Sequence, residues 1–148
     1  MGKICTFFGH RDARPDLYML KEQIRRLIED RDVTTFWCGG YGAFDRAAAK
    51  TVWELQREYQ YIRLILVLAY PPRSRNGIDP IYDGFLYPEF LKDTPQKLCI
   101  IRRNEWIAEN CDIAVCFIDH PSGGAYYGYR TARENGKVIY NLGLLPKG

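Results

Sequence analysis

The sequence predicts an α/β fold of the Rossmann-like type, in which helices cover both faces of a mostly parallel sheet of about five strands. Short apolar runs alternate along the chain with segments whose apolar residues recur every three or four positions. Several of the apolar runs end at glycines or polar turns, after which a helical pattern begins. Strands that alternate with helices form parallel sheets through right-handed crossovers, so we expect a three-layer sandwich.

Length and composition narrow the class of protein. The chain has 148 residues, of which 47% are hydrophobic and 26% are charged, as in a globular domain with a substantial core. We expect a single domain over residues 1–148, because no repeat, low-complexity tract or linker divides the sequence. The formal net charge of +3 argues against nucleic acid as a partner, since nucleic-acid-binding proteins carry a clustered basic face.

Composition also predicts a cytoplasmic protein without a membrane partner, a cofactor or a metal site. No apolar run reaches the length of a membrane span, and residues 1–10 lack the features of a signal peptide. The five cysteines form no CxxC pair, and Cys5, Cys38 and Cys116 lie in apolar runs, as reduced core cysteines do. The two histidines lack zinc-ligand spacing relative to the cysteines, which argues against zinc.

The first half of the chain predicts three strands and two helices. Residues 3–8 form an apolar run, typical of a strand that is buried on both faces. Residues 15–30 follow helical spacing, with Pro15 in the first turn and Asp16 near the positive end of the helix. The remaining elements of this half are a strand over 33–38, a helix over 43–59 and a strand over 62–69.

The second half begins with a long irregular segment. Residues 70–96 combine Pro, Gly, Asn and Asp with several aromatic side chains, and loops of this length are uncommon in compact domains. We expect a lid or a subunit contact, with an irregular excursion that covers a sheet edge as the alternative. Residues 97–101 indicate a short strand. The later elements are a helix over 102–110, a strand over 112–118, a helix over 124–135 that stops at Gly136, and a strand over 137–142.

Three turns that follow strands carry the candidate site, because open parallel sheets bind ligands beyond the carboxyl ends of their strands. The first is Gly9-His10-Arg11, the second is CGGYGAFD over 38–45, and the third is DHPSGGAYYG over 119–128. Glycines let backbone amides approach a ligand, and the helix that follows each turn adds its positive end. If the three turns share one edge of the sheet, they surround a single anionic small molecule.

Two charged residues of these turns have predicted roles. Arg11 is expected to clamp a phosphate or carboxylate, with an ion pair to Asp12 or Asp16 as the structural alternative. The stretch from Gly40 to Asp45 matches only part of the GxGxxG dinucleotide pattern. Because Asp45 would repel a phosphate, we expect it to accept hydrogen bonds from ribose hydroxyls or a base amine, unless it only favours the helix dipole.

The other candidates have weaker individual signals. His10 orients a ligand or carries a proton, His120 has the same two options with less support, and Ser122 offers a hydroxyl to phosphate. Trp106 is predicted to be a core residue and not a platform for a base. The predicted ligand-binding residues are Gly9, His10, Arg11, Gly39, Gly40, Gly42, Asp45, Asn104, Ser122, Gly123 and Gly124.

Five stretches of the chain, in this order, resemble the YpsA-like branch of the SLOG superfamily, a Rossmann-related group that includes the LOG and DprA proteins. They are FFGHR, CGGYGAFDRAAA, RRNEWIAENCDIAVCFID, SGGA and ARENGKVIYNL. The resemblance implies a pocket formed by the three turns, a nucleotide or nucleotide-derived ligand such as an ADP-ribose-like signal, and a homo-oligomer. The chain departs from the family at Ala125, where Thr is common, and at Asp45, where Glu or Gln is common.

Three functions follow as hypotheses. The leading one is a sensor, sequestering or regulatory protein that binds a nucleotide-derived ligand without converting it. The alternative is an N-glycosidase or ribosyl transferase that acts on nucleoside monophosphates, as some LOG relatives do, with Asp45 as the catalytic carboxylate. The PGGxGTxxE signature of those enzymes does not occur in this chain. The third is an interaction protein whose aromatic loop, including Tyr82 and Phe85, binds a partner.

Overall fold

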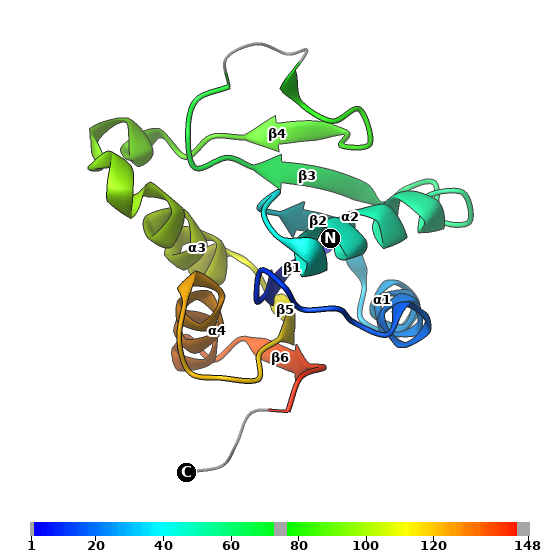
Figure 1. The fold of residues 1–148 in the computed structure, drawn as a ribbon. Coiled ribbons are helices and arrows are strands. Elements are labelled where there is room, and N and C mark those ends of the chain that lie inside the picture. Colours follow the sequence, from blue (N-terminus) through cyan, green and yellow to red (C-terminus); the bar gives the residue numbers. More distant parts are fainter. Residues whose placement is uncertain (1, 73–76, 145–148) are drawn as a thin grey trace.

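The computed structural model describes residues 2–72 and 77–144 and has the predicted Rossmann-like α/β fold (Figure 1). Its sheet has six strands, all parallel, in the order β4-β3-β2-β1-β5-β6. The strands are β1 (Lys3–Gly9), β2 (Val33–Cys38), β3 (Arg63–Val67), β4 (Gly84–Leu86), β5 (Ile113–Phe117) and β6 (Val138–Asn141). The flanking α-helices are α1 (Leu17–Asp30), α2 (Ala43–Leu55), α3 (Cys99–Asn110) and α4 (Gly124–Glu134).

The helices form two layers around the sheet, as Figure 1 shows, with α1 and α2 on one face and α3 and α4 on the other. The first face buries Phe7 of β1 against Phe44 of α2 and the apolar side of α1. The second face buries Phe8 of β1 against Ile107 of α3 and Ala132 of α4. Because successive residues of a strand point to opposite faces, β1 contributes to both cores.

The order of the strands reverses at β1. Strand β1 pairs with β2 on one side and with β5 on the other, and the chain reaches β5 only after it has built the half that ends in β4. The loops that leave β1 and β5 therefore turn toward opposite faces of the sheet. In open α/β sheets a crevice forms at such a switch point, beyond the carboxyl ends of the strands.

Helix α1 begins two residues later than the sequence predicts. Asp16 is its N-cap, and the carboxylate accepts a hydrogen bond of 3.0 Å from the amide of Met19. Pro15 therefore precedes the cap and does not lie in the first helical turn, although its fixed φ still suits the extended approach to the cap. Leu20, Ile24, Leu27 and Ile28 form the buried side of α1, in keeping with the helical spacing of residues 15–30, whereas Leu17 is exposed.

The prediction of a strand over 97–101 is wrong. A short 3-10 helix, η3 (Gln96–Leu98), leads directly into α3, which begins at Cys99. The apolar residues here form the buried side of a helix, since Cys99 packs against Leu91 of the preceding 3-10 helix η2 (Glu89–Asp93). Five residues are too few to distinguish a strand from a buried helical turn by periodicity.

The predicted loop over 70–96 contains the sixth strand. Strand β4 pairs in parallel with β3, and Asp83 just before it accepts a hydrogen bond of 2.7 Å from the amide of Leu64. A three-residue edge strand that includes Gly84 carries no alternating pattern, so the sequence did not predict it. Residues 73–76 of the predicted loop lie outside the described residues.

Two further predictions concern the core. The five cysteines are buried and free, as predicted for reduced core residues. Trp106 packs into the core on the α3 side, where its ring stacks on Trp37 with the ring centroids 5.3 Å apart, so it is a core residue as predicted. Across residues 2–72 and 77–144, no helix is long and apolar enough to cross a membrane.

Candidate functional site

The turns after β1, β2 and β5 meet around one cavity of about 490 Å³, to which α3 also contributes. We call it the switch-point cavity. Every residue of the predicted binding set except Gly40 lines it. Gly40 instead lines a neighbouring cavity of about 380 Å³, beside Leu66 and Tyr70. The structure therefore brings together residues from separate parts of the chain, as the turn hypothesis requires.

The first turn is fixed by backbone hydrogen bonds and by the packing of Gly9. The amide of His10 donates to the carbonyl of Phe117 over 3.3 Å, and the amide of Ala13 donates to the carbonyl of His10 over 2.9 Å. A side chain at Gly9 would clash with the ring of Phe44, so this glycine is required for packing of α2 against β1. The absence of a Cβ at Gly9 therefore has a structural reason besides any role in binding.

The backbone of Arg11 is held by a hydrogen bond, whereas its side chain has no ion-pair partner among the described residues. Its carbonyl accepts a hydrogen bond of 2.8 Å from the amide of Ala43, which ties the first turn to the start of α2. Within the described part of the chain, its side chain forms no ion pair with Asp12 or Asp16, and Asp16 is engaged as the cap of α1. Arg11 is exposed and lines the switch-point cavity, so its guanidinium can reach an anion that binds there.

Asp45 stabilises the second turn. Its two carboxylate oxygens accept hydrogen bonds from the amides of Gly39 and Gly40, and the residue is buried. Burial raises the pKa of Asp45 to about 6, although the hydrogen bonds from the two glycines and the nearby charge of Arg103 oppose this change. Asp45 lines the cavity, but its oxygens already have partners, so contact with a ribose or a base remains a prediction.

Arg103 and Tyr41 line the switch-point cavity and are absent from the predicted set. Arg103 lies in the second turn of α3, and its buried guanidinium donates to the carbonyl of Gly39 over 2.9 Å and to that of Val67 over 3.2 Å. The exposed ring of Tyr41 lies over it at 5.5 Å. Burial lowers the pKa of Arg103, and the charge of Asp45 opposes this change.

Asn104 connects the two helices on one face of the sheet. Its side-chain nitrogen donates to the carbonyl of Gly124 over 3.4 Å, and its side-chain oxygen accepts from Nε of Arg103 over 3.1 Å. Both polar atoms of the side chain are therefore engaged within the protein. Asn104 positions the start of α4 relative to α3, which is a structural role, and its predicted contact with a ligand remains a prediction.

The third turn presents the start of α4 to the cavity. Gly123 has a φ of 90°, which a residue with a side chain rarely adopts, and it occupies the N-cap position without capping the helix. The first amides of an α-helix have no acceptor inside the helix, and among residues 2–72 and 77–144 no side chain caps α4. The exposed Ser122 lies immediately before these amides and also lines the cavity.

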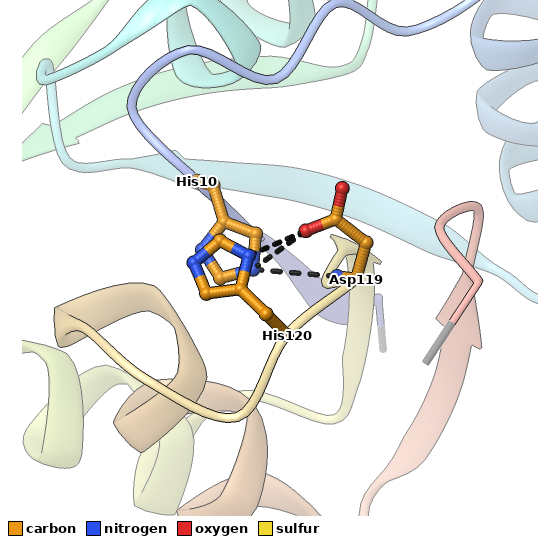
Figure 2. Close-up of side chains that lie close together, drawn as sticks. All are labelled: His10, Asp119 and His120. Carbon is orange, nitrogen blue, oxygen red and sulfur yellow. Dashed lines mark hydrogen bonds and ion pairs between the residues drawn. The ribbon is translucent and has the colours of Figure 1, made fainter. Parts of the chain in front are cut away.

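Both histidines meet beside Asp119, although they are far apart in the sequence (Figure 2). Their rings stack with centroids 3.6 Å apart and an interplanar angle of 11°. One carboxylate oxygen of Asp119 lies 2.6 Å from Nδ1 of His120 and 3.4 Å from Nε2 of His10. The amide of Asp119 also donates to Nε2 of His10 over 3.3 Å. Burial and the neighbouring His120 lower the pKa of His10, so the neutral imidazole is favoured.

Asn141 holds the end of β5, from which Asp119 and His120 project. Its side-chain oxygen accepts from the amide of Ile118 over 2.9 Å, and its side-chain nitrogen donates to the carbonyl of Ile118 over 3.0 Å. These two hydrogen bonds fix the peptide unit immediately before Asp119. Asn141 is the last residue of β6, so this contact ties the end of β6 to the end of β5.

The comparisons with known proteins identify a shared fold. A scan against protein-family models and a search of curated proteins both gave no match. Among solved structures, DNA processing protein A (DprA) from Helicobacter pylori aligns with a TM-score of 0.65 and 17% identity. The alignment covers 99% of this chain and 66% of that chain, and the structure of that protein is described as giving insight into its single-stranded DNA binding mode. DprA from Streptococcus pneumoniae aligns with a TM-score of 0.67 and 19% identity over 95% of this chain and 50% of that chain.

The chain thus spans just under two thirds of one solved relative and half of the other. At these levels of identity the similarity concerns the fold alone. Over nearly its whole length, this chain has the Rossmann-like α/β fold that is also found in DprA.

Proposed function

We propose that this chain binds a nucleotide-derived ligand of the ADP-ribose type in the switch-point cavity and acts as a sensor, sequestering or regulatory protein. We also propose that it belongs to the YpsA-like branch of the SLOG superfamily and forms a homo-oligomer, as the resemblance implies. The fold shared with DprA is consistent with a place in that superfamily.

The observation that carries the proposal is the convergence of donors on one cavity. Arg11, whose side chain forms no ion pair with another described residue, lines this cavity together with the start of α4. Guanidinium groups and free helix amides are the donors that proteins use for phosphate. The cavity volume of about 490 Å³ also lies within the range of roughly 300–1,000 Å³ that is typical of small-molecule sites.

The remainder of the cavity suits the other parts of such a ligand. Tyr41 presents an exposed aromatic ring at the wall, held over Arg103, on which a base can stack. Phe8 and Ile107 add apolar surface deeper in the cavity, while Asp12 adds an exposed carboxylate at the first turn. A ligand with a phosphate, a sugar and a base would therefore meet complementary groups at each part.

The geometry gives less support to the enzymatic alternative. An N-glycosidase needs a carboxylate beside the anomeric carbon, to stabilise a positively charged transition state. Asp45 is the candidate, but both of its oxygens accept backbone hydrogen bonds from Gly39 and Gly40. The carboxylate therefore acts first as a support for the second turn, and binding without conversion is the better supported function.

Calorimetric titration of the chelator-treated protein with ADP-ribose, AMP and inorganic phosphate tests the proposal. We expect ADP-ribose to bind with the highest affinity of the three. Arg11→Ala should weaken that binding by about tenfold or more, because a hydrogen bond to a charged group contributes roughly 1.5–3 kcal/mol. Arg14→Ala is the matched control, since Arg14 is exposed, lies three positions further along and does not line the cavity.

Each remaining outcome of the titration has a defined meaning. Absence of binding to all three ligands by folded protein would refute the proposal, and so would equal affinities of the wild type and Arg11→Ala. If a single-stranded DNA oligonucleotide binds more tightly than ADP-ribose, the proposal of a small ligand is wrong. The ligand would then be nucleic acid, as named for the Helicobacter pylori protein. Release of free base from nucleoside monophosphates, lost in Asp45→Asn, would favour the enzymatic alternative.

A further inference from the structure

We propose that His10, Asp119 and His120 form a binding site for a divalent transition-metal ion of the zinc type at the wall of the switch-point cavity. One ligand comes from the turn after β1 and two from the turn after β5 (Figure 2). The inference does not depend on the nucleotide-binding proposal, because the three side chains form the site by themselves.

The donor atoms lie at the separations that a shared ion needs. One nitrogen of each ring and a carboxylate oxygen all lie within 4.8 Å of one another. With metal–ligand bonds of about 2.0–2.1 Å, two ligands of a tetrahedral ion are about 3.3 Å apart. Nε2 of His10 and Oδ1 of Asp119 are 3.4 Å apart, which already matches this value.

The distance between His120 and Asp119 has to increase slightly before an ion can bind between them. Nδ1 of His120 is 2.6 Å from Oδ1 of Asp119, a hydrogen-bonding distance, and the two rings are stacked almost in parallel. Because a metal ion lies in the plane of each imidazole that binds it, the rings must tilt apart when an ion enters. The side chains of Asp119 and His120 are each 51% exposed, so they are free to move, whereas His10 is held in the core.

The chemistry of the donor set selects the class of ion. Two imidazoles and one carboxylate suit Zn²⁺ and neighbouring transition metals, whereas Mg²⁺ prefers a shell of oxygen ligands. Three protein ligands leave one coordination position open, as in metal sites that bind a further molecule. Since His10 and His120 both line the switch-point cavity, an ion held between them lies at its wall, where its open position is accessible to water or to an anion.

The backbone supports the site on both sides. His10 is anchored by the hydrogen bond from its amide to the carbonyl of Phe117, the last residue of β5. Asn141 fixes the peptide of Ile118, immediately before Asp119. On binding, Nε2 of His10 exchanges the hydrogen bond of 3.3 Å from the amide of Asp119 for the bond to the metal. The ligands are thus presented by two rigid strand ends that pair with each other.

Titration with Zn²⁺ and Co²⁺ tests the site in tag-free, chelator-treated full-length protein without any nucleotide. We expect one Zn²⁺ per chain, no response to Mg²⁺ in the same range, and a weakening of Zn²⁺ binding by at least about tenfold in Asp119→Asn and in His120→Ala. Both substitutions fall on half-exposed side chains, so the fold should persist, and circular dichroism checks this. Asp93→Asn, an exposed carboxylate on η2 outside the cavity, is the matched control.

A second readout separates this site from the five free cysteines. The chain contains two histidines, so resonances of histidine ring nitrogens report on this pair alone, and both should shift with one equivalent of Zn²⁺. Co²⁺ should give ligand-field bands without a thiolate charge-transfer band. Unchanged affinity in both variants, a thiolate spectrum, or histidine resonances that do not respond would overturn the proposal. None of these results depends on whether the protein binds ADP-ribose.

Discussion

At the scale of single residues, the buried carboxylate of Asp45 supports the second turn of the candidate site, while its predicted contact with a ligand stays a prediction. Asp45 lies at the third position of α2, and its oxygens face back toward the amides of Gly39 and Gly40. A carboxylate that is buried in this way is easier to protonate than one in the unfolded chain. Asp45 should therefore make its own contribution to the pH dependence of stability.

We expect the contribution of Asp45 to stability to be largest below about pH 4 and to be lost as the pH rises toward 6. Burial raises its pKa from 3.8 to about 6, so ionisation costs more in the folded than in the unfolded state. Relative to Asp45→Asn, which stays neutral, the wild type should lose roughly 2 kcal/mol of unfolding free energy between pH 4 and pH 7.

Urea unfolding of both proteins at several pH values measures this difference. Altered hydrogen bonding to the glycine amides changes the unfolding free energy of Asp45→Asn by a similar amount at every pH. The raised pKa is therefore tested by how the difference between the two proteins changes with pH, and not by its absolute size. A difference that stays constant from pH 4 to pH 7 would contradict a raised pKa.

Other residues of the site could not be predicted from the sequence, because they are brought together only by contacts between distant parts of the chain. Arg103 and Tyr41 contact each other across 62 positions of chain. Tyr41 lies in the second turn, where the glycines and Asp45 carried the prediction, and Arg103 lies in a helical segment whose pattern does not indicate a ligand. The sequence shows that the two histidines lack zinc-ligand spacing relative to the cysteines. It does not show the pairing of β1 with β5, which brings the turns that carry His10 and His120 together. By contrast, Arg11 and the glycines follow directly on strands, so alternation of strands and helices was enough to place them on one edge.

At the scale of elements, the start of α2 and the start of α4 use glycine for different reasons. Gly42 has a φ of 89°, and a Cβ there would lie 3.0 Å from the Cα of Arg11. Gly123 has a φ of 90°, but no atom lies within 4 Å of the position of a Cβ. The first turn therefore packs against the second through Gly42, whereas Gly123 faces open space beside the cavity.

Gly42→Ala should lower the free energy of unfolding by about 1–2 kcal/mol or more, because the left-handed conformation is strained for alanine and the backbone of Arg11 blocks its side chain. Gly124→Ala is the matched control. Gly124 begins α4 in helical conformation, and a Cβ there would make an ordinary contact of 3.7 Å with Asn104. We expect the control to change stability by less than about 0.5 kcal/mol in urea unfolding. Similar losses in both variants would refute this assignment.

The elements also show where sequence patterns suffice and where they fail. Strands β1, β2 and β5 are buried on both faces, and their apolar runs identified them with nearly correct bounds. Strand β4 is a three-residue edge strand, held by pairing with β3 and by the contact from Asp83 to the amide of Leu64. Its stability comes from contacts that are distant in sequence, so no local pattern indicated it.

At the scale of the whole molecule, the central strand joins the two cores. Phe7 points into the core under α1 and α2, and Phe8 points into the core under α3 and α4. The stacked Trp37 and Trp106 belong to the second core, whereas Trp53 lies on α2 and is 39% exposed. Loss of either helical layer exposes one side of β1 and removes support for the residues that face the other layer.

The chain should therefore unfold in a single cooperative transition, as the prediction of one domain over residues 1–148 requires. In Trp53→Phe, fluorescence reports only on Trp37 and Trp106, on the side of α3, while far-ultraviolet circular dichroism reports on the helices of both layers. Because Phe7 and Phe8 couple the layers, the two signals should give the same urea midpoint. Trp53→Phe itself changes an exposed side chain, so its midpoint by circular dichroism should match that of the wild type. A circular dichroism transition that precedes the fluorescence transition would show that α1 and α2 unfold separately, and the chain would then consist of two cooperative units.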